Sequence, residues 1–291
     1  MTAKGNVALV NQKERDGLGS SSADRENGSL PSPEFVVEEN RIVEAYSHRT
    51  KNVPANWYTP FSEGDLLITQ SIERSVLRSL QRFGCAPLEG KRILEVGCGT
   101  GHWLARFLVW GAEPEKVSGI DLLADKISQA RRLLPAEVTL EARSATSLDF
   151  PDESFDLVFQ FTVFSSILDD RMRQQAAAEM LRVLKPTGSI VWYDLCVDNP
   201  RNPDVRGVRK REIKNLFPGR LVHFDRLVLL APLARAAPSL FRLLAPIKLL
   251  RTHYVALITL PRTTSQIPTE SHELLPRNQA EQDCSSSAAR A

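Results

Sequence analysis

Residues 92–103 of this 291-residue chain read RILEVGCGTGHW. An apolar run with strand-forming residues leads into three glycines at alternate positions, Gly97, Gly99 and Gly101. Glycine has no Cβ and tolerates positive φ, so such a turn lets the backbone approach a ligand closely. A strand, a glycine turn and a following helix are typical of nucleotide-like cofactor sites in α/β proteins. The stretch therefore predicts a cofactor site, and its details indicate which cofactor.

The chain around this turn alternates between strand and helix patterns. Apolar runs such as 155–161 (FDLVFQF) and 189–195 (SIVWYDL) are separated by amphipathic stretches, of which 171–184 is predicted to end at Pro186 and Gly188. Alternation of this kind predicts parallel strands with helices on both faces. With residues 253–260 inserted antiparallel beside the preceding strand, the sheet has seven strands. The expected fold is α/β, a doubly wound, mostly parallel, Rossmann-like sheet.

The ends of the chain differ from its middle. Residues 1–30 and 262–291 are polar and lack apolar periodicity, so we expect a disordered arm and a disordered tail. The domain itself is expected to span residues 31–261. It begins with helices over 31–84, and a helical insertion at 230–251 precedes its last strand.

Composition excludes several classes of protein. The formal net charge of +2 argues against a nucleic-acid partner. No uncharged apolar run reaches about 18 residues and no signal peptide is evident, so we expect no transmembrane segment. No CxxC pair or Cys/His cluster is present, which predicts no metal site and reduced thiols in the cytoplasm; the cysteines are Cys85, Cys98, Cys196 and Cys284.

The spacing of the glycines argues against a dinucleotide. A GxGxxG turn needs its third glycine at position 102, where this chain has the bulky His102. Gly101 comes one residue too early for a pyrophosphate on the helix start. An acidic residue followed by alternating glycines, Glu95 to Gly101, suits a cofactor without phosphates.

At this point the sequence resembles the class I S-adenosylmethionine (SAM)-dependent methyltransferases, especially the methyltransferase type 11 group of small-molecule enzymes. The resemblance covers residues 60–195 well and the remainder loosely. Four stretches carry it in the right order: LEVGCGTG, VSGIDLL, SLDFPDESFDLV and LRVLKPTGSIVWYD.

The resemblance implies the residues that bind SAM. The glycine turn, with Cys98, would wrap the methionine end, and Glu95 would place its amino group. Asp121 would accept the ribose hydroxyls, although it is also a natural helix N-cap. Where the family commonly has an adenine-binding Asp, this chain has Ser144. The implied set is Glu95, Gly97, Cys98, Gly99, Gly101, Asp121, Leu122, Ser144, Ala145, Gln160, Phe161 and Thr162.

A hydroxyl acceptor usually needs a general base, whereas methyl transfer otherwise depends on alignment and exclusion of water. The candidate bases are Asp194 at a strand end, His102 after the glycine turn and His253 at the start of the last strand. Two of them also have a structural alternative, a loop cap for Asp194 and a packed imidazole for His253.

Two segments are candidates for covering the site. Trp57 and Tyr58 lie before the second helix and would act as a lid over cofactor and substrate, or simply pack in the core. The Leu-rich insertion 230–251 has three interpretations: an acceptor lid, a membrane-surface segment, or an insertion packed on the sheet. We favour the lid, and its leucines point to an apolar acceptor.

Together these observations predict a cytoplasmic SAM-dependent methyltransferase that acts on a small molecule, at a hydroxyl oxygen. Two alternatives remain: a degenerate fold that binds SAM or a partner without catalysis, and an NAD(P)-dependent reductase. The expected partner is a small, apolar acceptor, with peripheral membrane contact through 230–251 as a further interpretation.

Overall fold

The computed structural model describes residues 33–52, 61–200, 202–227, 234–235, 237–239 and 252–261. Its helices and 3-10 turns are α1 (Pro33–Asn52), α2 (Glu63–Arg82), α3 (His102–Val109), η1 (Pro114–Lys116), α4 (Ala124–Leu133), η2 (Phe164–Ser166), α5 (Asp170–Val183) and α6 (Lys210–Leu216). Its strands are β1 (Ile93–Val96), β2 (Val117–Asp121), β3 (Thr139–Ala142), β4 (Phe155–Phe161), β5 (Leu184–Leu195), β6 (Leu221–Leu227) and β7 (His253–Thr259).

The strands form one seven-stranded sheet in the order β3-β2-β1-β4-β5-β7-β6. β1 pairs in parallel with β2 and with β4, while β7 lies antiparallel between β5 and β6. The predicted doubly wound, mostly parallel sheet with an antiparallel last strand is therefore confirmed. The chain order reverses between β1 and β4, and ligands of open α/β sheets bind beyond the carboxyl ends of the strands at such a point.

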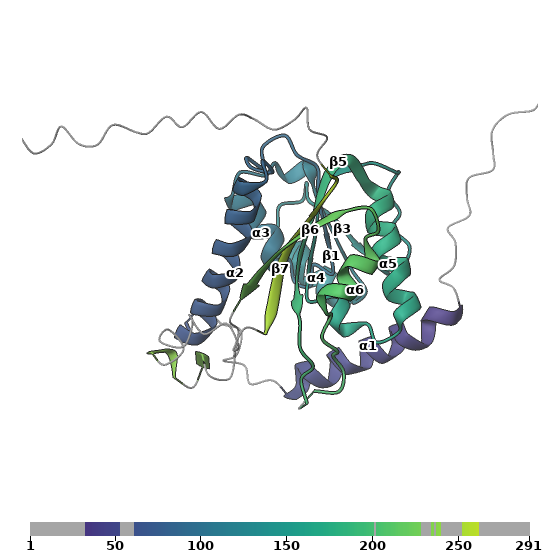
Figure 1. Ribbon diagram of the computed structural model, residues 1–291. Coiled ribbons are helices and arrows are strands. Elements are labelled where there is room, and N and C mark those ends of the chain that lie inside the picture. Colours follow the sequence, from purple (N-terminus) through teal and green to yellow (C-terminus); the bar gives the residue numbers. More distant parts are fainter. Residues whose placement is uncertain are drawn as a thin grey trace, which may run out of the picture.

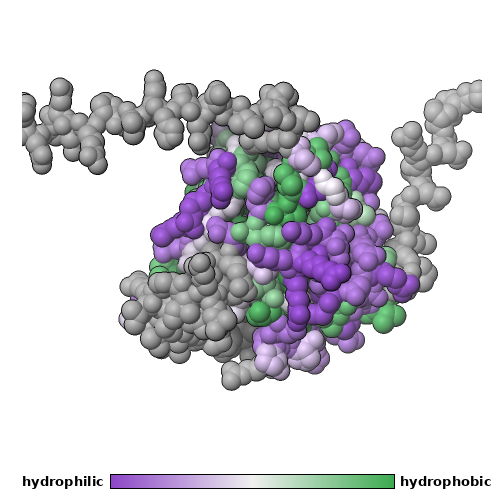
Figure 2. Space-filling view, in the orientation of Figure 1, coloured by the Kyte–Doolittle hydropathy of each residue, from purple (hydrophilic) through white to green (hydrophobic). Residues whose placement is uncertain are grey.

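Helices cover both faces of the sheet, as Figure 1 shows for α2 and α3 on one side and α5 and α6 on the other. Apolar side chains of α2, α3 and α4 pack on one face, and those of α1, α5 and α6 pack on the opposite face. All four residues of β1 are buried because both faces of this central strand are covered. The outer surface over α5 and α6 is mostly hydrophilic (Figure 2).

The junction between α5 and β5 differs from the prediction. α5 ends at Val183, and β5 begins at the next residue, so Pro186 and Gly188 lie inside the strand rather than at the helix end. The pairing with β4 shifts from Phe155–Leu184 to Leu157–Ser189, which makes this stretch an irregularity in the strand. A Cβ at Gly188 would lie 2.9 Å from the carbonyl oxygen of Asp156, so glycine is needed where the two strands approach.

Several predictions fall outside the described residues: the arm, the tail, Trp57, Tyr58 and most of the insertion 230–251. The described part of that insertion contacts α2, where Ala234 is fully buried against Leu67 and Ile68. Arg235 also forms an ion pair with Asp65 at 2.6 Å. The proposed boundaries, the lid and the membrane contact stay predictions, as does the cytoplasmic location. Among the described helices, none is long and apolar enough to cross a membrane.

The centre of β2 offers a test of the packing between sheet and helix. A Cβ at Gly119 would lie 2.6 Å from Leu104 Cδ1 and 2.9 Å from Cys98 Sγ. We expect Gly119→Ala to lower the free energy of unfolding by about 1–3 kcal/mol through overpacking, measured by urea denaturation. Gly90→Ala is the control. Its added methyl has no atom within 4 Å, so any loss of stability there comes from the backbone φ of +77° and not from overpacking. Equal destabilisation by both changes would contradict this packing argument.

Candidate functional site

The glycine turn after β1 is held by hydrogen bonds to the end of β2. The amides of Gly97 and Cys98 donate to the carbonyl of Ile120 at 2.8 and 2.9 Å. Gly97 has a φ of +73°, and a Cβ there would overlap the side chain of Val163. Gly99 has a φ of +53°, but open space lies beside it. The first glycine thus permits packing within the protein, and the second leaves room for a ligand.

Gly101 explains why the helix begins where it does. Its φ is +84°, and a Cβ would lie 2.7 Å from Leu134 Cδ1 and 3.2 Å from Ala130 Cβ on α4. The close approach between helices therefore depends on Gly101, one residue before His102. His102 is the first residue of α3 and is exposed to solvent. A turn of this spacing accommodates His102 without strain.

Asp121 ends β2 with its carboxylate between two turns. One oxygen accepts the amide of Gly99 at 2.8 Å, and the other accepts the amide of Leu123 at 2.9 Å. Burial raises the pKa of Asp121, and these two amide donors oppose that effect. Each carboxylate oxygen has further lone-pair capacity, so ligand hydroxyls can still be accepted.

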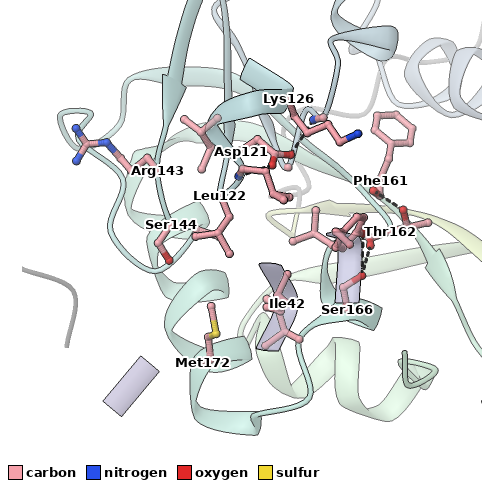
Figure 3. A pocket seen from close by; sticks show the side chains of 18 residues that line it. Ile42, Asp121, Leu122, Lys126, Arg143, Ser144, Phe161, Thr162, Ser166 and Met172 are labelled. Atoms are coloured by element: carbon pink, nitrogen blue, oxygen red, sulfur yellow. Dashed lines mark hydrogen bonds between the residues drawn. The ribbon is translucent and has the colours of Figure 1, made fainter. Parts of the chain in front are cut away.

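A cavity of about 250 Å³ lies at the carboxyl edge of the sheet, around the point where the strand order reverses (Figure 3). Its volume is near the lower end of the range for small-molecule sites, about 300–1,000 Å³. Many of the predicted cofactor residues line it, namely Gly97, Gly99, Asp121, Leu122, Ser144, Ala145, Phe161 and Thr162. Thr162 has a φ of +59°, an unusual conformation for a residue other than glycine.

Four predicted cofactor residues do not line the cavity. Gly101 acts through packing, and the Cys98 sulfur points toward Gly119 in the core. Gln160 is fully buried; its Oε1 accepts the amide of Val163 at 3.0 Å and its Nε2 donates to the carbonyl of Tyr193 at 3.3 Å. It thereby braces the chain just after β4. Glu95 lies in the buried layer below the turn.

Glu95 is an unusual buried acid. Only 1% of it is exposed, and its Oε2 has no hydrogen-bond partner among the described residues. Burial raises the pKa of Glu95 well above its ordinary value, and repulsion from Asp121 raises it further. A cationic ligand close to this turn would favour the charged form of Glu95 and offset part of that rise in its pKa.

In the loop after β3, the Ser144 hydroxyl is hydrogen-bonded within the loop. The Ser144 hydroxyl forms a 2.8 Å hydrogen bond with that of Thr146, whose amide also approaches it at 3.3 Å. Arg143 lines the same end of the cavity but binds Glu141 at 3.0 Å and Asp149 at 3.1 Å. Polar contacts at this end are therefore largely satisfied within the protein.

The sequence analysis did not find the opposite wall. Ile42 and Tyr46 of α1 line the cavity with residues of the loop after β4 and the start of α5; the further lining residues are Ile120, Leu123, Lys126, Arg143, Val163, Ser166, Ile167 and Met172. The sequence analysis predicts helices over 31–84, but not which part of the chain the first of them meets. Figure 1 shows α1 crossing the edge of the sheet.

Side chains of α1 bind the loop that carries this wall. Arg41 Nη2 donates to the carbonyl of Ser166 at 2.6 Å, and Glu38 Oε1 accepts the amide of Leu168 at 2.5 Å. The hydroxyls of Tyr46 and Ser166 lie 3.1 Å apart. The helix is thus bound to the cavity wall by hydrogen bonds from Glu38 and Arg41 and by the Tyr46–Ser166 hydroxyl pair. Glu38 and Arg41 also form an ion pair with each other.

The three candidate bases lie away from the cavity lining. Asp194 is fully buried, and its oxygens accept the amides of Ser165 at 3.1 Å and Leu195 at 2.8 Å. Burial raises the pKa of Asp194 to about 6. Its bond to Ser165 positions η2, which is a structural role.

His253 does lie at the carboxyl edge, because β7 runs antiparallel to β5. It stacks on Tyr193 with ring centroids 5.2 Å apart, and its Nδ1 lies 2.9 Å from the Thr252 hydroxyl. Burial lowers the pKa of His253 to about 4, so the ring is neutral at pH 7. Among the described residues, no group of three or more His, Cys, Asp or Glu side chains is placed to hold a metal ion.

Comparison with known proteins agrees with this geometry. Residues 93–188, about a third of the chain, match the family model described as a methyltransferase domain. A fatty-acid O-methyltransferase of Mycolicibacterium smegmatis is 38% identical over 136 residues, covering 46% of this chain and 47% of the relative. An O-methyltransferase of Penicillium expansum is 34% identical over 120 residues, covering 40% and 42%. The chain thus spans less than half the length of either relative.

A solved structure agrees at the level of the fold. It is that of a Burkholderia thailandensis 1,6-didemethyltoxoflavin-N1-methyltransferase with bound 1,6-didemethyltoxoflavin and S-adenosylhomocysteine. It superposes with a TM-score of 0.53 at 17% identity, covering 81% of this chain and 93% of that one.

These findings support a class I SAM-dependent methyltransferase fold for the matched segment. Residues 93–188, from β1 into β5, match the methyltransferase domain family model, and the cofactor that this match implies is SAM. The narrower type 11 group stays a prediction.

The residues present fit that cofactor. SAM carries an ammonium group beside its carboxylate, and Glu95 Oε2, which has no partner among the described residues, can accept a hydrogen bond from such a donor. Open space beside Gly99 admits a ligand against the backbone. The individual roles assigned to the twelve predicted residues stay predictions.

The role of Asp121 can be tested by binding. We expect Asp121→Ala to weaken S-adenosylhomocysteine binding by about 1–3 kcal/mol, because hydrogen bonds to a charged group are lost. Isothermal titration calorimetry measures this directly. Asp125→Ala removes an exposed carboxylate from the first turn of α4 and is the matched control. Unchanged affinity in a folded Asp121→Ala protein would refute the assignment.

The buried Asp194 should leave a signature in the pH dependence of stability. Its pKa of about 6 in the folded protein exceeds the ordinary value of 3.8, so the folded state binds more protons between these values. The contribution of Asp194 to stability therefore decreases as pH rises from about 4 to about 6, by up to about 3 kcal/mol. In Asp194→Asn this decrease should be absent from urea unfolding measured across that window. Exposed Asp125→Asn should retain it, and a slope unchanged by Asp194→Asn would contradict the prediction.

Proposed function

We propose that the protein is a SAM-dependent O-methyltransferase whose acceptor is a small, mostly apolar molecule. The observation that carries this proposal is the Asp121 carboxylate, held by two amides at the cavity beside the open side of Gly99. This arrangement lies within the segment that matches the methyltransferase domain family. Both relatives described above are named as O-methyltransferases, which supports oxygen as the acceptor atom.

SAM supplies a methyl group bonded to a positively charged sulfur, so the protein needs chiefly to align the acceptor and exclude water. Phe161 and Thr162, at the end of β4, line the cavity together with the α1 residue Ile42. Ile167 and Met172 add further apolar surface. These walls suit an apolar acceptor. The mycobacterial relative is named for a fatty acid, which is a mostly apolar molecule.

The acceptor group is the finer part of the proposal. The sequence analysis favours a hydroxyl, and that preference stays a prediction because none of the three candidate bases lines the cavity. The alternative of an NAD(P)-dependent reductase is disfavoured by His102, which stands where a GxGxxG turn needs its third glycine. A degenerate, non-catalytic fold is separated from the proposal only by turnover.

Calorimetry with SAM, S-adenosylhomocysteine and NADPH tests the proposal. We expect SAM and its demethylated product to bind and NADPH not to bind. Incubation with SAM labelled at the methyl carbon and a panel of apolar alcohols, phenols and acids should then yield a labelled product. Binding of NADPH without SAM would overturn the proposal, and SAM binding without transfer to any of them would favour the non-catalytic alternative.

A further inference from the structure

Lys126 is a cation that lines the cavity and whose charge the protein leaves available. It lies in the first turn of α4 and is partly buried. No ion pair or hydrogen bond joins its side chain to any residue that the structure describes. Arg143, the other cation of the lining, is instead bound by Glu141 and Asp149. Lys126 is therefore the cation here with capacity for an anionic ligand.

The neighbouring Asp121 does not use this capacity. Both of its oxygens already accept backbone amides, at 2.8 and 2.9 Å. Lys126 acts on Asp121 through space, and this attraction helps to hold down the pKa of that carboxyl. A direct ion pair between the two side chains is not formed, so the lysine amine is free to bind elsewhere in the cavity.

The direction of the side chain indicates where. In Figure 3 the Lys126 amine extends from above Asp121 toward the side of the cavity lined by Phe161 and Thr162. Arg143 and Ser144 lie on the other side in this view. The proposed function assigns the walls that include Phe161 and Thr162 to the apolar acceptor, so the free cation faces the acceptor end.

The candidate bases are committed elsewhere. The Asp194 oxygens bind the amides of Ser165 and Leu195. His253 stacks on Tyr193, on the sheet face that α2 and α3 cover, and His102 is exposed on α3. The internal segments 53–60 and 228–251 contain no Asp, Glu or His in their sequence. An acceptor that is already ionised makes no demand on any of these groups.

We propose that the acceptor is a carboxylic acid with an apolar body, and that Lys126 binds its carboxylate. This inference rests on the proposed function. It assigns the acceptor oxygen to a carboxylate, in place of the hydroxyl that the sequence favours. The acceptor oxygen forms a bond to the methyl carbon, while the carbon–sulfur bond breaks and its electron pair passes to sulfur. The charges of acid and sulfur cancel, a methyl ester and a neutral thioether result, and no proton moves.

The role of Lys126 is to position the anion. Because the acceptor loses its negative charge during the reaction, the lysine binds the starting acid more strongly than the reacting complex. Its removal should therefore raise KM much more than it lowers kcat. A purely structural role for Lys126 would not separate these two constants.

The experiment compares acids with alcohols of matched shape. Labelled SAM is supplied with octanoate or 1-octanol, and with benzoate or phenol. We expect label in the methyl esters of the acids and not in the ethers. Transfer to 1-octanol or phenol without transfer to the acids would overturn the inference and leave O-methylation intact. If SAM binds and no acid is methylated, the inference also fails; if SAM does not bind, the proposed function itself fails.

Variants then test the lysine. We expect Lys126→Met to raise KM for the methylated acid about tenfold, with kcat changed by no more than about twofold. Calorimetry of octanoate with the protein saturated with S-adenosylhomocysteine should show the same loss of affinity without turnover. Arg132→Met removes one charge from an exposed position on the same helix and should leave both quantities unchanged. Equal acid affinity in Lys126→Met and wild type would refute the assignment.

Discussion

One buried carboxylate holds together the two turns on which the cavity depends. Asp121 accepts an amide from the glycine turn and another from the turn that begins α4. The same edge of β2 receives the amides of Gly97 and Cys98 at the Ile120 carbonyl. Each of these amides has a hydrogen-bond acceptor inside the protein, and a buried amide without one would be costly. The shape of the site therefore follows from satisfying four backbone donors at the end of one strand.

The parts of the fold that local patterns specify were predictable. The sheet follows from apolar runs and helical periodicity, and the turn follows from Gly97 and Gly99, whose positive φ angles glycine supports. The start of β5 was misplaced, at Ser189 instead of Leu184, because Pro186 and Gly188 are also tolerated at an irregularity in a strand. A sequence shows that such residues interrupt a regular element, but not which of two adjacent elements they interrupt.

The site was predictable only where it is built from the matched segment. Asp194 lies next to the last residue of β5, near the expected strand end, yet its Oδ2 accepts the amide of Ser165, a contact between residues 29 positions apart. Ile42, Tyr46 and Lys126 reach the cavity through the packing of helices, and their side chains carry no local signal of that destination. Long-range packing decides which side chains at the end of a strand meet ligand and which meet protein.

The attachment of α1 has a consequence for how the site comes into existence. The contact between Arg41 and Ser166 joins residues 125 positions apart, and the one between Glu38 and Leu168 joins residues 130 positions apart. Contacts of such separation carry a loop-closure cost that only nearly complete folding repays. The α1 wall of the cavity is therefore expected to form late in folding. A ligand that contacts both α1 and the sheet binds only when α1 is docked. Its binding therefore stabilises the docked position of the first helix.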